Sequence, residues 1–241
     1  MAALTPMMAQ YMEVKNQYKD CILFYRLGDF YEMFFDDALT ASRELEITLT
    51  GRDCGQEERA PMCGVPYHAC DIYLNKLIEK GYKVAICEQM EDPKLAKGIV
   101  KREVIRIVTP GTNMSQAILD ETRNNYLMCI FGCNDEYGVA VCDITTGEFR
   151  LCHISSTSKL YDEINKYSPT EIIGNGAFLS CDLNFDYMKE KMKITISEAP
   201  SHYFNDDTCE DFIKRQFKVG TIDGLGIDEQ EDMLLSAGAL L

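Results

Sequence analysis

Two β-prone runs separated by only two residues constrain the fold of this chain more than any other feature. The runs CILFYRL and FYEMFF flank Gly28-Asp29, a pair typical of a tight hairpin turn. A turn lies at the surface, so at least one aromatic residue beside it should lie near solvent. Phe30 and Glu32 are two residues apart, and such residues point to the same face of a strand. The sequence therefore predicts a phenyl ring and a carboxylate together at the rim of a hairpin.

Helix and strand patterns alternate along the first half of the chain. TPMMAQYMEVKNQY predicts a helix with Thr5 as its cap and Pro6 at its first position, and DDALTASRELE and ACDIYLNKLIEKG predict two more. ITLTGRD, YKVAICEQM and REVIRIVTP predict strands, whereas the prolines and glycine of APMCGVPYHA predict a loop. This alternation indicates an α/β domain with a mixed sheet.

The second half begins with three strands in a row. YLMCIFGC, GVAVCDIT and GEFRLCHIS are separated by turn residues and predict an antiparallel meander, followed by further helices and strands. We expect an α/β domain over 1–112, a linker over 113–125 and a second α/β domain over 126–241. The final helical pattern, EDMLLSAGALL, has no stop signal, so we expect a fragment of a longer protein.

The net charge of −15 is unevenly divided, with −3 in residues 1–112 and −12 in residues 113–241. Non-specific binding to nucleic acid depends on cations that displace counterions from phosphates. The chain is therefore a poor non-specific binder of DNA. The asymmetry indicates two units with different surroundings.

The 11 cysteines include no C-x-x-C pair, and the chain has only 3 histidines. Zinc sites usually show paired ligands at closer spacing, so we predict no metal site. The N-terminus lacks the pattern of a signal peptide, and no apolar run is long enough to span a membrane. We therefore expect reduced cysteines in a cytoplasmic protein without membrane contact.

The strongest candidate for catalysis is Asp143, a carboxylate inside the apolar run VAVCDITTG. With Glu148 and Glu171 as further ligands, it could hold Mg²⁺ in a metal-dependent nuclease. The alternative is that Asp143 caps the turn that follows it, because Asp readily accepts hydrogen bonds from the backbone two residues on. We favour turn capping. No phosphate-binding loop of the G-x-x-x-x-G-K-[ST] type occurs in the chain.

Phe30 and Glu32 also allow two interpretations. Phe30 could belong to a core, with Glu32 as a solvated charge at a sheet edge. Alternatively, Phe30 could be a wedge that enters the minor groove of DNA between base steps. Glu32 would be repelled by phosphates, so beside a wedge it helps only by accepting a hydrogen bond from a base.

Several motifs support the second interpretation by resemblance. LFYRLGDFYEMFFDDA closely resembles the mismatch-recognition motif of the MutS family of bacterial DNA mismatch repair proteins. TPMMAQY, APMCGVPYHA, VAICEQMEDP, REVIRIVTPGT, DITTGEF and SAGALL resemble further segments of that family in the same order. The resemblance covers essentially the whole chain. It implies a mismatch-binding α/β domain and then a connector domain with a ribonuclease-H-like fold.

The resemblance also implies roles for individual residues. Phe30 matches the phenylalanine that stacks on a mispaired base, and Glu32 matches the glutamate that hydrogen-bonds that base. PMCGVP, residues 61–66, matches a loop along the minor groove, in which Cys63 replaces an expected small residue. The expected contacts with the minor groove or the DNA backbone are made by Met62, Gly64, Pro66, Arg106 and Thr109.

The expected partners follow from the same resemblance: mismatched double-stranded DNA, a second MutS subunit and MutL. Family members act on DNA of the bacterial nucleoid. The clamp, lever and ATPase domains would lie beyond residue 241, and ATP and Mg²⁺ would bind there. We expect no cofactor and no enzymatic activity in this chain itself. A partner-docking module without DNA contact is the remaining alternative.

Overall fold

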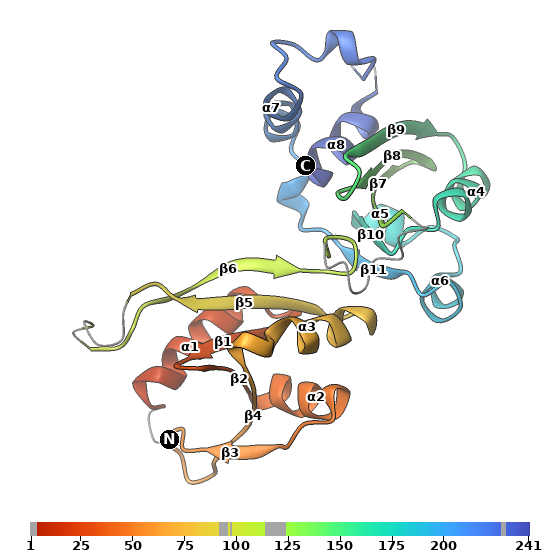
Figure 1. The fold of residues 1–241 in the computed structure, drawn as a ribbon. Coiled ribbons are helices and arrows are strands. Elements are labelled where there is room, and N and C mark those ends of the chain that lie inside the picture. The colour runs from red at the N-terminus through yellow and green to blue at the C-terminus, as the bar shows by residue number, and fades with distance from the viewer. Residues whose placement is uncertain (1–3, 92–95, 97, 114–123, 228–229) are drawn as a thin grey trace. The chain divides into compact units, whose positions relative to one another are not determined.

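The computed structural model describes residues 4–91, 96, 98–113, 124–227 and 230–241. The chain divides into two compact units, Met1–Ile118 and Leu119–Leu241 (Figure 1). Residues 114–123, most of the expected linker, lie outside the described residues. Both units combine helices with a mixed sheet, so the predicted α/β class is confirmed. Within the described residues, no helix has the length and apolar character needed to cross a membrane.

The first unit is built on a six-stranded sheet with the order β3-β4-β2-β1-β5-β6. β1 pairs with β5 in parallel, and the other neighbouring strands of the sheet are antiparallel. The strands are β1 Cys21–Leu27, β2 Phe30–Phe34, β3 Thr50–Arg52, β4 Ala60–Pro66, β5 Lys83–Gln89 and β6 Arg102–Val108. The helices are α1 Pro6–Gln17, α2 Phe35–Leu45 and α3 Cys70–Glu79, with the 3₁₀ turn η1 Tyr67–Ala69 before α3.

Apolar side chains cover both faces of this sheet. Ala38 and Leu45 of α2 and Leu77 of α3 pack on one face, which we call the α2/α3 face. Met8 and Tyr11 of α1 pack on the other, which we call the α1 face. The sheet is thus buried on both sides near its middle, as expected for an α/β unit.

The predicted hairpin is present. β1 and β2 are joined by Gly28 and Asp29 alone, and Leu27 pairs with Phe30. Gly28 has a φ of 59°, which favours glycine at this position of a two-residue hairpin turn.

The prediction of a loop in APMCGVPYHA is wrong, because Ala60–Pro66 forms strand β4 in the interior of the sheet. Its prolines are tolerated because each has a paired strand on one side only. Pro61 pairs with β3 and lies beyond the last residue paired with β2. Pro66 pairs with β2 and lies beyond the residues paired with β3. Prolines in sheets are confined to such positions, because proline has no N–H to donate to a second neighbour.

Two smaller expectations are also corrected. The strand predicted from ITLTGRD is limited to Thr50–Arg52. Thr5 does occupy the N-cap position of α1, but its side chain makes no capping hydrogen bond. Pro6 at the first helical position leaves one backbone donor fewer to satisfy, which reduces the need for a side-chain cap.

The second unit contains a five-stranded sheet with the order β11-β10-β7-β8-β9. Its first three strands form the predicted antiparallel meander, and β10 joins β7 in parallel. The strands are β7 Tyr126–Cys133, β8 Glu136–Asp143, β9 Glu148–Ile154, β10 Glu171–Gly174 and β11 Thr195–Glu198. The helices are α4 Thr157–Tyr167, α5 Gly176–Leu179, α6 Phe185–Glu190, α7 Asp206–Phe217 and α8 Glu231–Leu240, with the 3₁₀ turns η2 Ser201–Tyr203 and η3 Asp223–Leu225.

Helices cover both faces of the second sheet as well. Leu160 and Ile164 of α4 pack into one core, and Ile213 of α7 and Ala237 of α8 pack into the other. α8 approaches β8 so closely that a Cβ added at Gly138 would lie 1.9 Å from the carbonyl oxygen of Asp232. Glycine is therefore required at this position for α8 to dock.

Candidate nucleic-acid interface

Phe30, the first residue after the hairpin turn, is 46% exposed. The neighbouring aromatic residues of the same run behave differently, since Tyr31 and Phe34 are both buried. Exposing a phenyl ring forgoes the free energy gained by burying it, about 1.5–3 kcal/mol for a large apolar side chain. A large apolar group at the tip of a hairpin is therefore available to contact another molecule.

The alternation along β2 places Phe30 and Glu32 on the same face, as predicted. Phe34, two residues further on, packs into the core on the α1 face, whereas Tyr31 and Met33 pack on the α2/α3 face. The strand thus runs from an exposed aromatic ring through a half-buried carboxylate into the core.

β4 provides the other half of this surface. Its residues Pro66, Gly64 and Met62 stand directly opposite Phe30, Glu32 and Phe34. Residues directly opposite in antiparallel strands present their side chains to the same face. The structure therefore brings together five of the predicted site residues on one surface, which we call the hairpin surface: Phe30, Glu32, Met62, Gly64 and Pro66.

Gly64 shapes the access to Glu32. A Cβ added at Gly64 would lie 3.4 Å from Cγ of Glu32 and 3.3 Å from the carbonyl oxygen of Tyr31. A glycine here leaves the side of the glutamate open. Cys63, the residue that departs from the family pattern, points away from this surface. It is buried among the side chains of the α2/α3 face.

Arg106 and Thr109 are not part of the hairpin surface. Arg106 pairs with Ile86, whose side chain belongs to the core on the α2/α3 face, so Arg106 lies on the opposite face from Phe30. Thr109 follows the end of β6 and hydrogen-bonds with Thr112, 2.9 Å between the two hydroxyl oxygens. The strand pairing places Thr109 at the end of the sheet remote from the hairpin turn.

Arg52 of β3 contacts the hairpin surface, and sequence reasoning missed this contact. Its Nη1 donates to Oε2 of Glu32 in an ion pair, and its guanidinium carbon lies 6.0 Å from the ring centre of Phe34. Because β4 separates β2 from β3, this contact depends on recognising β4 as a strand. Without it, nothing in the sequence links residue 52 to residue 32.

The hairpin turn is fixed by contacts from Arg26 and Tyr67, which sequence reasoning did not predict. Nε of Arg26 donates to the carbonyl oxygen of Gly28 at 2.6 Å, and the guanidinium of Arg26 lies 3.7 Å from the ring centre of Tyr67. The backbone N–H of Tyr67 donates to the carbonyl oxygen of Asp29 at 3.0 Å. Both peptide groups of the turn are thus fixed, which holds the backbone before Phe30 in one conformation.

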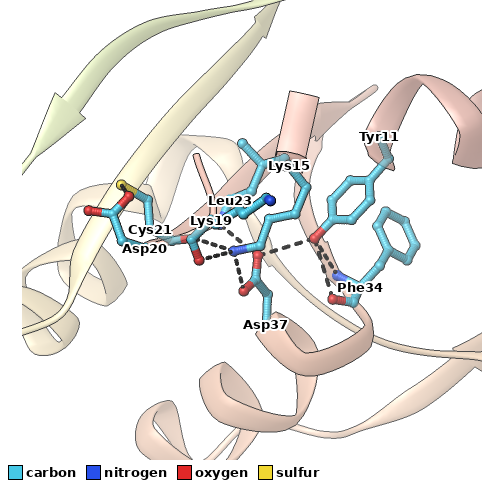
Figure 2. Close-up of polar contacts among 8 residues, drawn as sticks. All are labelled: Tyr11, Lys15, Lys19, Asp20, Cys21, Leu23, Phe34 and Asp37. Atoms are coloured by element: carbon cyan, nitrogen blue, oxygen red, sulfur yellow. Dashed lines mark hydrogen bonds and ion pairs between the residues drawn. The ribbon is translucent and has the colours of Figure 1, made fainter. Parts of the chain in front are cut away.

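The far end of β2 is anchored by a buried polar network (Figure 2). Asp37 of α2 accepts from Lys15 Nζ at 2.9 Å and from the backbone N–H of Leu23 at 3.0 Å. The Tyr11 hydroxyl lies 3.2 Å from Asp37 and 3.3 Å from the carbonyl oxygen of Phe34. Burial, and then the charge of Asp37, raise the pKa of Tyr11, so the phenol stays neutral. The network links α1 to the junction between β2 and α2.

The geometry around Asp143 favours turn capping. Its side chain accepts from the backbone N–H of Thr145 at 2.8 Å, from the Thr145 hydroxyl at 2.6 Å and from the backbone N–H of Asn125 at 3.3 Å. Burial opposes ionisation of Asp143, but these hydrogen bonds outweigh it and lower its pKa. Glu148 hydrogen-bonds instead to Tyr126 at 2.8 Å. Among the described residues, no group of three or more His, Cys, Asp or Glu side chains is placed to hold a metal ion.

Comparison with known proteins identifies the family. The sequence model described as MutS domain I matches residues 5–117, and the one described as MutS domain II matches residues 125–241. This chain belongs to the MutS family.

Individual MutS relatives are similar over the whole chain. A protein named DNA mismatch repair protein MutS from Lachnoclostridium phytofermentans is 59% identical over 241 residues, which cover 100% of this chain and 26% of the relative. The protein of the same name from Acetivibrio thermocellus is 56% identical over 100% of this chain and 28% of its own length. The chain thus spans about a quarter of the length of these MutS relatives.

Proposed function

We propose that this chain recognises mispaired and unpaired bases in double-stranded DNA at the start of mismatch repair. Phe30 stacks on the base from the minor groove, and the Glu32 carboxylate accepts a hydrogen bond from it. One observation carries the proposal: a phenylalanine that is 46% exposed at the tip of a braced hairpin, with a carboxylate on the same face. Membership of a family whose relatives are named DNA mismatch repair proteins supports it.

The selectivity follows from the cost of deforming DNA. Inserting an apolar wedge unstacks a base step, at a cost of a few kcal/mol, and kinks the duplex. A mispaired base is already less well stacked and paired, so the same deformation costs less there. Phe30 then replaces part of the lost stacking. Gly64 leaves room for a base edge to approach Glu32, and Met62 and Pro66 lie on either side of Gly64 on the same face of β4.

The remaining partners would belong to a longer polypeptide of the length of its MutS relatives. We place its action on nucleoid DNA in the bacterial cytoplasm, as one subunit of a MutS dimer that signals to MutL. ATP and Mg²⁺ would be bound by parts of the polypeptide outside these residues. The second unit would act as the connector between them. Arg106 and Thr109 would contact DNA only if the bound duplex, or a second segment of DNA, extended beyond the hairpin surface.

The test is Phe30→Ala in the native polypeptide that contains these residues. Stacking on an aromatic side chain contributes roughly 1–3 kcal/mol per base, so the ratio of heteroduplex to homoduplex affinity should fall about ten-fold or more. Fluorescence anisotropy with a G·T heteroduplex and its matched homoduplex measures this ratio.

Phe212→Ala is the matched control, because Phe212 is an exposed phenylalanine of the second unit, at 41%. It should leave the ratio unchanged. Retention of full mismatch preference in Phe30→Ala would show that Phe30 is not the wedge.

A further inference from the structure

Arg52 and Glu32 form an ion pair on the surface that would face DNA. The Glu32 side chain is 16% exposed and the Arg52 side chain 38%. The two residues come from β2 and β3, the strands on either side of β4, where Glu32 stands opposite Gly64 and Arg52 opposite Ala60. In the free protein, the carboxylate needed for base recognition is therefore already occupied by a cation.

The ion pair has two opposite effects on DNA binding. A bare carboxylate would repel the phosphates of any approaching duplex, and Arg52 neutralises it. However, a base that donates to Glu32 must compete with the guanidinium for the same oxygens. The attraction within an ion pair is partly offset by the cost of removing its charges from water, so a competing interaction of similar strength can replace it.

A DNA duplex offers Arg52 such a competing interaction. Guanidinium groups bind phosphate oxygens through two parallel hydrogen bonds, and arginine is common in phosphate recognition for this reason. The Arg52 side chain is the more exposed member of the pair, and its guanidinium carbon lies 6.0 Å from the ring centre of Phe34.

The geometry points to Arg52 as a specificity-determining residue that exchanges partners when a mismatch is bound: on perfectly paired DNA it stays with Glu32, and on mismatched DNA it moves to a phosphate and releases Glu32 to the base. This inference rests on the proposed function of Phe30 and Glu32. It assigns to Arg52 a role that differs between the two complexes, and that difference can be measured.

The experiment is a double-mutant cycle in the native polypeptide with Glu32→Gln, Arg52→Gln and the double variant. The cycle reports whether residues 32 and 52 still interact in each complex. On a homoduplex, the pair persists in both the free and the bound state, so the two single effects on affinity should multiply.

On a G·T heteroduplex, the pair is present only in the free state. Each single substitution removes the ion pair from the free protein and so removes the cost of breaking it on binding. The double variant removes this cost only once. The double variant should therefore bind the heteroduplex at least about 2- to 5-fold more weakly than the product of the single effects, because exposed ion pairs reach this range and the Glu32 side chain is less exposed. If the single effects on affinity multiply on both DNAs, the ion pair is purely structural. If the double variant deviates from their product equally on both DNAs, Arg52 contacts a phosphate whether or not a mismatch is present. Either result would overturn the inference.

Two further variants keep the test decisive. If Arg52→Gln loses cooperative melting, Arg52→Met replaces it in the cycle, because methionine can still cover the ring of Phe34. Phe30→Ala is measured in parallel. If Phe30→Ala retains mismatch preference, the proposed function fails; if that preference is lost but the cycle shows no difference between the DNAs, only the role of Arg52 fails.

Discussion

At the scale of single residues, Phe30 and Glu32 present opposite chemistry to the same surface. In the proposed function, the apolar ring favours insertion between bases, while the carboxylate penalises any complex in which no base donates to it. Such a penalty falls mainly on perfectly paired DNA. In this proposal, specificity is a difference between two affinities, and Glu32 lowers the affinity for perfectly paired DNA.

The charge of Glu32 can be removed while its shape is kept. In the native polypeptide, Glu32→Gln should bind a homoduplex more tightly at low salt, because the surface loses one negative charge and the Arg52 cation loses its anionic partner. The ratio of heteroduplex to homoduplex affinity should fall as a result. Glu57→Gln, a change of an exposed glutamate in the same unit, controls for the altered net charge. Homoduplex affinity equal to that of Glu57→Gln would contradict this role.

Asp143 is predicted to stabilise the second unit and not to catalyse. Asp143→Asn should lower the free energy of unfolding by about 1–3 kcal/mol, because charged hydrogen bonds to the turn are lost. The folded-state pKa is lowered, so the contribution is complete above the ordinary aspartate pKa of about 3.9 and is lost as the pH falls through the lowered value. Urea unfolding at neutral and acidic pH measures this. DNA cleavage with Mg²⁺ that disappeared in Asp143→Asn would support the nuclease alternative instead.

At the scale of elements, local patterns predicted most helices and strands but not β4. The hairpin, the meander and the amphipathic helices follow from residues close in sequence. Whether Ala60–Pro66 forms a loop or a strand depends on pairing with β2, 28 to 36 residues away, as well as with β3, because its prolines are compatible with a sheet only where one neighbour is missing. The residues of the hairpin surface could be named from the sequence, whereas their pairing and the Arg52 contact required that long-range register.

The polar network at the end of β2 should be important for the first unit. Asp37→Asn leaves the Lys15 cation in a largely buried site without its anion. The expected loss of stability is about 2 kcal/mol or more, since breaking fully buried ion pairs costs about 3–5 kcal/mol. Tyr11→Phe removes only hydrogen bonds of the same network and should cost about 1 kcal/mol. Denaturant unfolding compares the two, and equal losses would show that the ion pair contributes nothing beyond its hydrogen bonds.

At the scale of the whole molecule, the charge of −15 opposes binding to a polyanion. The hairpin surface is a small contact, and a bend in DNA requires a second point of attachment to hold it. We therefore expect the isolated 241-residue chain to bind a G·T heteroduplex only weakly, with low salt bringing little improvement. We also expect it not to hydrolyse ATP. Sub-micromolar, mismatch-selective binding in anisotropy measurements would show that the first unit binds DNA without further domains.

The most direct test of the account is to observe residue 30 against the mispaired base. The chain contains 0 tryptophans, so Phe30→Trp places a fluorescent ring at the proposed wedge and nowhere else in these residues. In the native polypeptide, the emission of the tryptophan at position 30 is obtained by subtracting the emission of the unsubstituted protein. Phe212→Trp is the control. The account predicts strong quenching by a saturating G·T heteroduplex, weaker quenching by a homoduplex and no change at position 212. Emission at position 30 that saturating heteroduplex leaves unchanged would contradict it.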